Sequence, residues 1–358
     1  MCRLALPLAL FFLCSGAVHA GLYNPAEPGE GKLNADFKIF QETLFSLRGI
    51  RLDKVMNDPL QMRYIMMQQS APRVVPADWS LAQRLSLSAY LIRREKHQEA
   101  IELLKPLSVR ERDNFLVYSN LASAYHLAGQ EPALAYDYLD QALSSWPAKW
   151  NGLDQNRKEF LEKIGWDQIK YQGFREAETY QLKLLQLRRR EKAKPGGKAE
   201  NLDDLFGVTF VGESGKYEAG NLAAKEKAKL PTKALTIVQQ LLVWSPHDPR
   251  LYWLLGEVYN AQGDVATALQ IFEELAGFNG TYRTDLLKDH SNILRAAPRP
   301  QGPSVTPEVD SKPAVPTDSP TQPLFDVRNL LVGFFVGIVV CIFAYWQFRE
   351  VRRRRQGR

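Results

Sequence analysis

The stretch PHDPRLYWLLGEVYNAQGDVATALQIFEELA, residues 246–276, decides how the chain folds. It divides into two segments whose apolar residues recur at the spacing of an α-helix. The first segment predicts a helix over 249–262 with Asp248 as its N-cap, and the second predicts a helix over 265–276. The apolar stripes of the two helices contain Tyr252, Leu255, Gly256 and Tyr259, then Ala268, Phe272 and Leu275.

Neither helix can bury its apolar stripe alone, so the stretch predicts two helices packed back to back. Gly256 and Ala268 are small, and we expect the two backbones to approach closely there. The pattern resembles the tetratricopeptide repeat (TPR), a 34-residue helix–turn–helix unit that places these residue types in this order. The resemblance implies a binding scaffold.

Other parts of the chain extend this pattern. A second TPR-like unit spans 114–147, with Gly129 at its turn and Pro147 at its end. A degenerate pair precedes it, predicted as helices over 79–94, capped by Asp78, and 98–107. Residues 231–246 lead in register into the opening stretch, and 282–294 predict the capping helix that such arrays need. The fold class implied is mainly α: a TPR-like α-solenoid of helical hairpins.

Two further segments interrupt the regular repeats. Helical patterns cover 155–165 and 166–192. In LFGVTFVGESGKYE, residues 205–218, apolar and aromatic residues flank Gly212-Glu213-Ser214-Gly215. That arrangement predicts a small β-hairpin insertion.

The two ends of the chain predict export and membrane anchoring. Residues 1–20 have the layout of a secretory signal peptide. One alternative is an uncleaved transmembrane helix. A lipoprotein signal is less favoured, because the bulky Leu13 precedes Cys14. Residues 329–348 predict one C-terminal transmembrane helix, followed by a basic tail over 349–358. The positive-inside rule places that tail in the cytoplasm and the body outside it, with a bacterial periplasm as the best fit.

Charge and cysteine content narrow the class of function. Of the net charge of +6, Arg3 contributes one charge and residues 349–358 a net five, so residues 21–348 are neutral overall. This balance gives no electrostatic reason to expect a nucleic-acid partner. The three cysteines, Cys2, Cys14 and Cys341, all lie outside the exported body. The body therefore has no disulfide, thiolate metal site or cysteine nucleophile.

The composition also divides the chain into segments. Residues 21–32 are rich in Gly, Pro and Glu and predict disorder, and 296–325 are rich in proline and predict an extended tether. The predicted divisions are 1–20, signal peptide; 21–77, a partly helical extension; 78–193, TPR-like repeats; 194–220, linker and β-hairpin; 221–295, repeats and cap; 296–325, tether; 329–348, membrane span; and 349–358, tail.

The TPR resemblance implies that the first helices of successive repeats line a groove that binds a protein or peptide partner. By pattern position, the groove residues are Arg250, Trp253, Glu257, Asn260, Leu116, Ser119, Ser123 and His126. An aromatic residue in a groove is a common binding anchor, although Trp253 can instead pack against the neighbouring repeat. No motif predicts catalytic residues, a metal or a cofactor.

These features lead to one main expectation and two alternatives. The main expectation is a membrane-tethered exported TPR scaffold for protein–protein interactions, in cell-envelope assembly or maintenance. The first alternative is an envelope enzyme, or a subunit of one, with a site near residues 150–220. The second is a structural organiser whose working part is the cytoplasmic tail.

Overall fold

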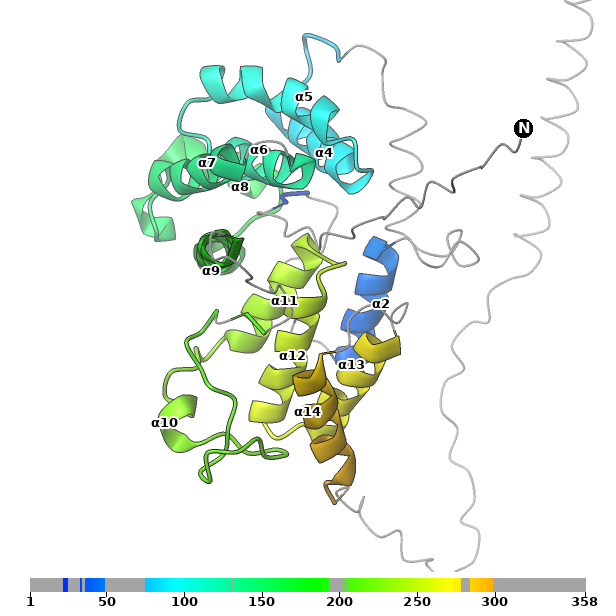
Figure 1. Ribbon diagram of the computed structural model, residues 1–358. Helices are drawn as coiled ribbons and strands as arrows, with labels where there is room; N and C mark the ends of the chain where they lie inside the picture. The colour runs from blue at the N-terminus through cyan, green and yellow to red at the C-terminus, as the bar shows by residue number, and fades with distance from the viewer. Residues whose placement is uncertain are drawn as a thin grey trace, which may run out of the picture. The chain divides into compact units, whose positions relative to one another are not determined.

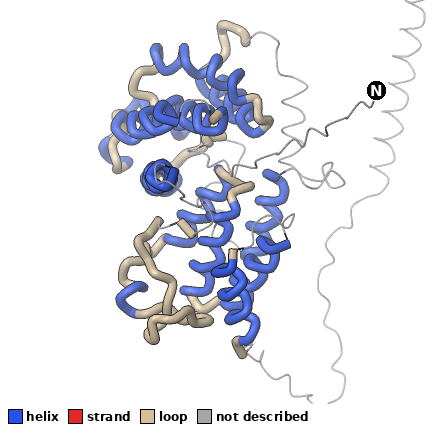
Figure 2. The backbone as a smooth tube through the Cα atoms, in the orientation of Figure 1, coloured by secondary structure: helices blue, strands red, loops and turns tan. Residues whose placement is uncertain are grey.

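The computed structural model describes residues 22–24, 33, 36–48, 75–129, 132–192, 202–203, 205–277 and 284–298 (Figure 1). The predicted signal peptide, the predicted tether beyond residue 298, the membrane span and the basic tail lie outside these residues. Within the described residues, the chain is mainly α-helical and contains no strand (Figure 2). None of the helices in these ranges is both long and apolar enough to cross a membrane.

The first group of helices comprises two antiparallel pairs. The helices pack in sequence order, each against the next: α4 (Leu81–Arg93), α5 (His97–Arg110), α6 (Phe115–Ala128) and α7 (Pro132–Ser145). Asn114 caps α6 by accepting hydrogen bonds from two backbone amides, and Gly129 ends this helix in the left-handed region, with φ 66°. Ser80, rather than the predicted Asp78, caps α4, because Ser80 and Gln83 form a capping box.

The second group contains the stretch that begins the sequence analysis. It consists of α11 (Ala234–Trp244), α12 (Pro249–Ala261), α13 (Val265–Gly277) and α14 (Asp285–Ala296), and each helix packs against the next. Asp248 caps α12 as predicted, with Pro249 in the first turn. The close approach of α12 and α13 is also confirmed, because a Cβ on Gly256 would lie 2.3 Å from Cε1 of Phe272. The predicted capping helix is α14, with Thr284 as its N-cap.

The remaining helices connect and flank these two groups. The longest is α9 (Gln168–Lys192), which packs against both α7 and α11. A short 3-10 helix, η2 (Trp150–Gly152), and α8 (Gln155–Lys163) precede it. One turn of helix, α10 (Ala224–Lys227), lies before α11, and α2 (Phe37–Arg48) packs against α11. The structure thus shows repeated helix pairs that share buried apolar side chains, as in a helical-repeat protein.

The predicted β-hairpin at 205–218 is wrong. The segment is an irregular loop with a tight turn closed by the amide of Gly212 and the carbonyl of Lys216, 2.8 Å apart (Figure 2). Groups outside the predicted hairpin bind its main chain: the Glu226 carboxylate accepts from the amide of Thr209, and the carbonyl of Val211 accepts from the amide of Ala223. Because these main-chain groups already have partners, no second strand is needed to pair them.

Candidate functional site

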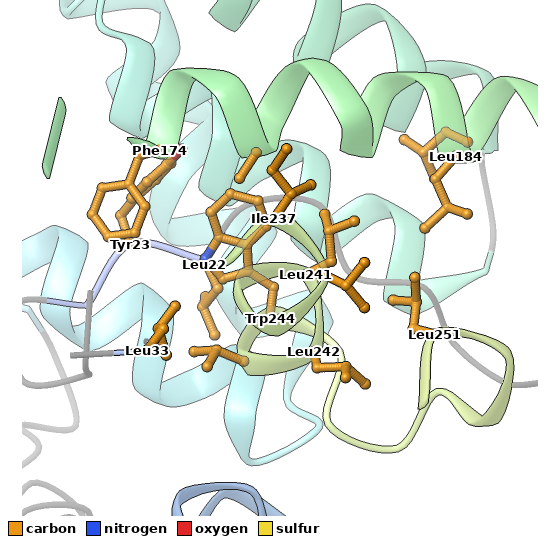
Figure 3. Packing of buried hydrophobic residues seen from close by; sticks show 14 of the residues in the cluster. Leu22, Tyr23, Leu33, Phe174, Leu184, Ile237, Leu241, Leu242, Trp244 and Leu251 are labelled. Carbon is orange, nitrogen blue, oxygen red and sulfur yellow. The ribbon is translucent and has the colours of Figure 1, made fainter. Parts of the chain in front are cut away.

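The residues immediately after the predicted signal peptide are buried among four helices. Leu22, Tyr23 and Asn24 are at most 8 % exposed and form an extended segment with no helix or strand of its own. Figure 3 shows Leu22 and Tyr23 beside Phe174 of α9 and Trp244 of α11. The predicted disorder of 21–32 is therefore wrong for these three residues, because two large apolar side chains find a cleft between the helix groups.

Asn120 of α6 holds the main chain of this segment. Its side-chain oxygen accepts a hydrogen bond from the amide of Tyr23 at 2.8 Å, and its nitrogen donates to the carbonyl of Tyr23 at 3.4 Å. The same nitrogen also lies 3.2 Å from Oγ of Ser88 on α4. An amide side chain suits this task because it offers an acceptor to the N–H and a donor to the carbonyl of the same residue.

Aromatic rings surround the side chain of Tyr23. Four ring centroids lie 5.2–5.8 Å from that of Tyr23, in tilted or edge-on arrangements that aromatic pairs favour. They belong to Phe115, Trp166, Phe174 and Trp244. We name the site formed by these rings, Asn120 and Glu178 the Tyr23 cleft.

The phenolic hydroxyl of Tyr23 donates to a carboxylate inside the protein. Its partner is Oε1 of Glu178 on α9, at 2.7 Å, and Glu178 is fully buried. Burial, and then the nearby Glu178 charge, hold the pKa of Tyr23 well above its usual value. The hydroxyl therefore keeps its proton at neutral pH and remains a hydrogen-bond donor to Glu178.

One polar side chain in the cleft lacks a partner. Gln240 of α11 is 2 % exposed and lines the same pocket as Leu22, Tyr23 and Asn24. Neither its amide oxygen nor its amide nitrogen makes a hydrogen bond to any residue that the structure describes. A buried amide in this state is costly, so the cleft has hydrogen-bonding capacity that the Leu22–Asn24 segment leaves unused.

α12, the first helix of the α12–α13 pair, holds the irregular loop at 217–221 in a similar way. Asn260 of α12 accepts a hydrogen bond from the amide of Gly220 at 2.6 Å and donates to the carbonyl of Glu218 at 3.0 Å. Close by, Tyr217 of the same loop stacks on His290 of α14, with ring centroids 3.5 Å apart. The loop at 217–221 therefore lies against α12 as the Leu22–Asn24 segment lies against α6.

The same face of α12 carries the other predicted groove residues. Trp253 is fully buried and donates through Nε1 to Oε1 of Glu257, at 2.8 Å. Nδ1 of His290 lies 2.6 Å from that oxygen. Burial, and then Glu257, raise the pKa of Tyr217. In this structure Trp253 contacts other parts of its own chain, which is the alternative that the sequence left open.

Arg250, the first of the predicted groove residues, belongs to a buried charge cluster. Its guanidinium contacts Glu191 of α9 at 2.7 Å and Asp203 at 2.8 Å. Arg188 of α9 contacts Asp203 at 2.6 Å and the N-cap Asp248 at 2.7 Å. Burial opposes the charge of Arg188, but the two carboxylates outweigh it and raise the pKa of the guanidinium. The cluster fastens the C-terminal part of α9 to the start of α12.

The groove positions predicted on α6 fall into two groups. Leu116 lines the same pocket as Leu22, and Ser119 lies by the hydroxyl of Tyr23. Ser123 is buried and His126 is half-buried. The structure therefore brings Leu116 and Ser119 together at the Tyr23 cleft, and Arg250, Trp253, Glu257 and Asn260 together on α12. A partner-binding role for any of them stays a prediction.

Sequence analysis missed Tyr23, Asn120 and Glu178. A signal for Asn120 existed, because it is a polar residue inside FLVYSNLASAY, where the rest of α6 is small or apolar. Within the described residues, no group of three or more His, Cys, Asp or Glu side chains is arranged to hold a metal ion.

The comparisons with known proteins leave the family undetermined. No family model matches the chain, and no curated protein or solved structure matches it. The packed helix pairs agree with a helical-repeat protein, and assignment to the TPR family stays a prediction.

Proposed function

We propose that this chain is an exported, membrane-tethered helical-repeat scaffold that binds segments of partner proteins in the cell envelope. One observation carries the proposal: the first helices of two pairs each grip a non-helical segment by its main chain. Asn120 and Asn260 both supply a donor and an acceptor to the gripped segment. A helix face that holds such segments of its own chain has the chemistry needed to hold those of another.

The tether and the location are supported by sequence alone. The signal-peptide pattern, the proline-rich segment 296–325 and the apolar segment 329–348 together favour a body held outside the cytoplasm. The lack of cysteine between residues 21 and 340 allows a direct test. A cysteine replacing the exposed Ser214 should react with a membrane-impermeant maleimide when only the outer barrier is opened. A cysteine replacing Gln356 should react only after the inner membrane is broken, and the opposite pattern would refute the orientation.

The interaction itself is tested by cross-linking mass spectrometry of the full chain in its native membrane. We expect a defined protein partner whose cross-links cluster near α6 or α12. Asn120→Ala and Asn260→Ala should reduce those cross-links, because each removes a side chain that hydrogen-bonds to the main chain of an extended segment. Asn292→Ala, on an exposed position of α14, is the matched control and should leave them unchanged. Equal cross-linking by all three variants would refute the assignment of the binding faces.

A further inference from the structure

The Leu22–Asn24 segment is held in the way that a peptide ligand is held. The Asn120 side chain accepts a hydrogen bond from the main-chain amide of Tyr23 and donates one to the main-chain carbonyl of Tyr23. The Tyr23 side chain enters a ring of aromatics and reaches one carboxylate. Main-chain recognition together with one anchoring side chain is typical of peptide binding to a groove.

The helices around the cleft are joined by contacts that do not involve this segment. The guanidinium of Arg93 on α4 donates to the carbonyl of Val243 at 2.6 Å and to that of Trp244 at 3.3 Å, both on α11. In addition, α9 packs directly on both α7 and α11. The walls of the cleft therefore have their own support, and the segment can leave without taking a wall with it.

The Leu22–Asn24 segment fits the cleft only in part. Gln240 is buried beside it and makes no hydrogen bond to any described residue. A second copy of this chain would bring the same three residues and leave Gln240 equally unused. A segment with the same tyrosine but a different polar neighbour would use that amide as well, and would fit better.

We propose that the Tyr23 cleft is a peptide-recognition site in which Leu22–Asn24 is the resident intramolecular ligand, displaced by a tyrosine-bearing extended segment of a partner protein. This inference rests on the proposed scaffold function and adds its regulation. Asn120 hydrogen-bonds to the main chain, Glu178 selects a hydroxylated ring, and Gln240 binds a polar group that the resident segment, despite containing Asn24, does not bring to it. The cleft is closed to partners until the resident segment is displaced.

The test measures binding of a peptide to the full chain in detergent. The probe is GLYNPAEP, the sequence of residues 21–28, labelled with fluorescein at its C-terminal end and followed by fluorescence anisotropy. A tethered ligand competes at an effective concentration that reaches the millimolar range. We therefore expect Tyr23→Ala, which empties the cleft, to bind the probe at least about tenfold more tightly than the wild type.

Two changes then identify the contacts. In the Tyr23→Ala background, Asn120→Ala should weaken probe binding about tenfold, because it removes two hydrogen bonds. A probe with phenylalanine in place of tyrosine should lose a similar factor, because a hydrogen bond to a carboxylate is lost. If Tyr23→Ala does not fold by circular dichroism, Tyr23→Phe replaces it, since that variant keeps the ring and weakens only the resident ligand. A folded variant that binds the probe no better than the wild type would overturn the proposal.

A peptide library distinguishes a foreign partner from a second copy. In the library, the two positions on either side of the probe tyrosine vary. GLYNPAEP already has asparagine after the tyrosine, so we expect better binding from members with a polar side chain before the tyrosine or a longer polar side chain after it. That advantage should be lost when Gln240→Leu is introduced. Two results together would overturn the assignment of a foreign partner. They are that no library member binds better than GLYNPAEP, and that the wild type forms a dimer that Tyr23→Ala does not form. If a partner cross-links in membranes but the probe does not bind, peptide recognition at the Tyr23 cleft is refuted. The proposed scaffold function is not affected by that result.

Discussion

Replacing Gly256 by alanine tests the packing on which the fold depends. Gly256 lies on α12 against α13, and an added Cβ would meet the Phe272 ring at 2.3 Å from Cε1 and 2.8 Å from Cδ1. Contacts this short are not found in folded proteins, so the ring or the helix must move. Phe272 is fully buried, so its ring has no path into solvent that would relieve the overlap.

Two opposing effects set the size of the change. Overpacking a well-filled core costs about 1–3 kcal/mol. Alanine in place of glycine inside a helix recovers about 1 kcal/mol of helix propensity. Because a 2.3 Å contact calls for a large movement, the packing cost should fall in the upper half of its range. We expect Gly256→Ala to lower the free energy of unfolding by about 1–2 kcal/mol.

Urea unfolding followed by circular dichroism at 222 nm measures this difference. Gly277→Ala is the matched control, because nothing lies within 4 Å of the Cβ it would add at the end of α13. It should leave the stability unchanged or slightly raised. Combining Gly256→Ala with Phe272→Leu should cost less than the two single changes added together, because the smaller side chain removes the overlap. A Gly256→Ala protein as stable as the wild type would refute the close approach of α12 and α13.

Three further predictions concern the charge cluster, the buried phenols and the loop on α12. Arg188→Met removes the guanidinium that pairs with the buried carboxylate of Asp248. This change should lower the free energy of unfolding, measured in urea, by about 3 kcal/mol or more. An unchanged urea midpoint would show that the cluster is not formed. Burial raises the pKa of Tyr171 to about 12, so this tyrosine ionises in the unfolded chain at a lower pH than in the folded protein. The stability that Tyr171 contributes should therefore be intact below pH 10 and lost between pH 10 and about 12. Tyr171→Phe should make the urea midpoint fall less steeply over that pH range. Asn260→Ala should release the loop at 217–221 and speed tryptic cleavage after the exposed Lys216, measured by mass spectrometry, with Asn292→Ala cleaved at the wild-type rate; equal rates would contradict the role of Asn260.

Local signals were enough to predict most helices of the fold. Asp248 and Pro249 mark the start of α12 because a cap and a first-turn proline act within one turn of chain. Gly129 marks the end of α6 because glycine reaches positive φ without strain. The close approach at Gly256 followed from residue size at a helical spacing. Each of these effects operates over a few residues, so the sequence displays it directly.

The loop at 205–223 and the Tyr23 cleft could not be predicted in this way. Thr209 and Gly220 give their amides to Glu226 and Asn260, and the second of these partners is 40 residues away in the sequence. Tyr23 meets its hydroxyl partner Glu178 across 155 residues. Periodicity carries no information about such contacts. A proline-rich neighbourhood also predicts disorder for the first residues of the body, although two of them have large apolar side chains.

The two asparagines are the strongest sign that segment binding is built into these helices. Asparagine inside a helix costs roughly 0.5 kcal/mol or more relative to alanine or leucine, because its amide competes with the backbone. A helix that only needs to pack on its neighbours has no reason to bury Asn120 or Asn260, at 0 % and 3 % exposure, in place of an apolar side chain. At both sites an extended segment that lies alongside and takes both the donor and the acceptor offsets this cost. An ionised glutamate at these positions would only accept, and would not supply the donor that the amide provides. The residue type, its burial and its two hydrogen bonds to a non-helical segment therefore agree at both sites, and they link these two asparagines to binding non-helical chain. Asn120 also contacts Ser88 of α4, so at that site the same amide joins the segment to two helices.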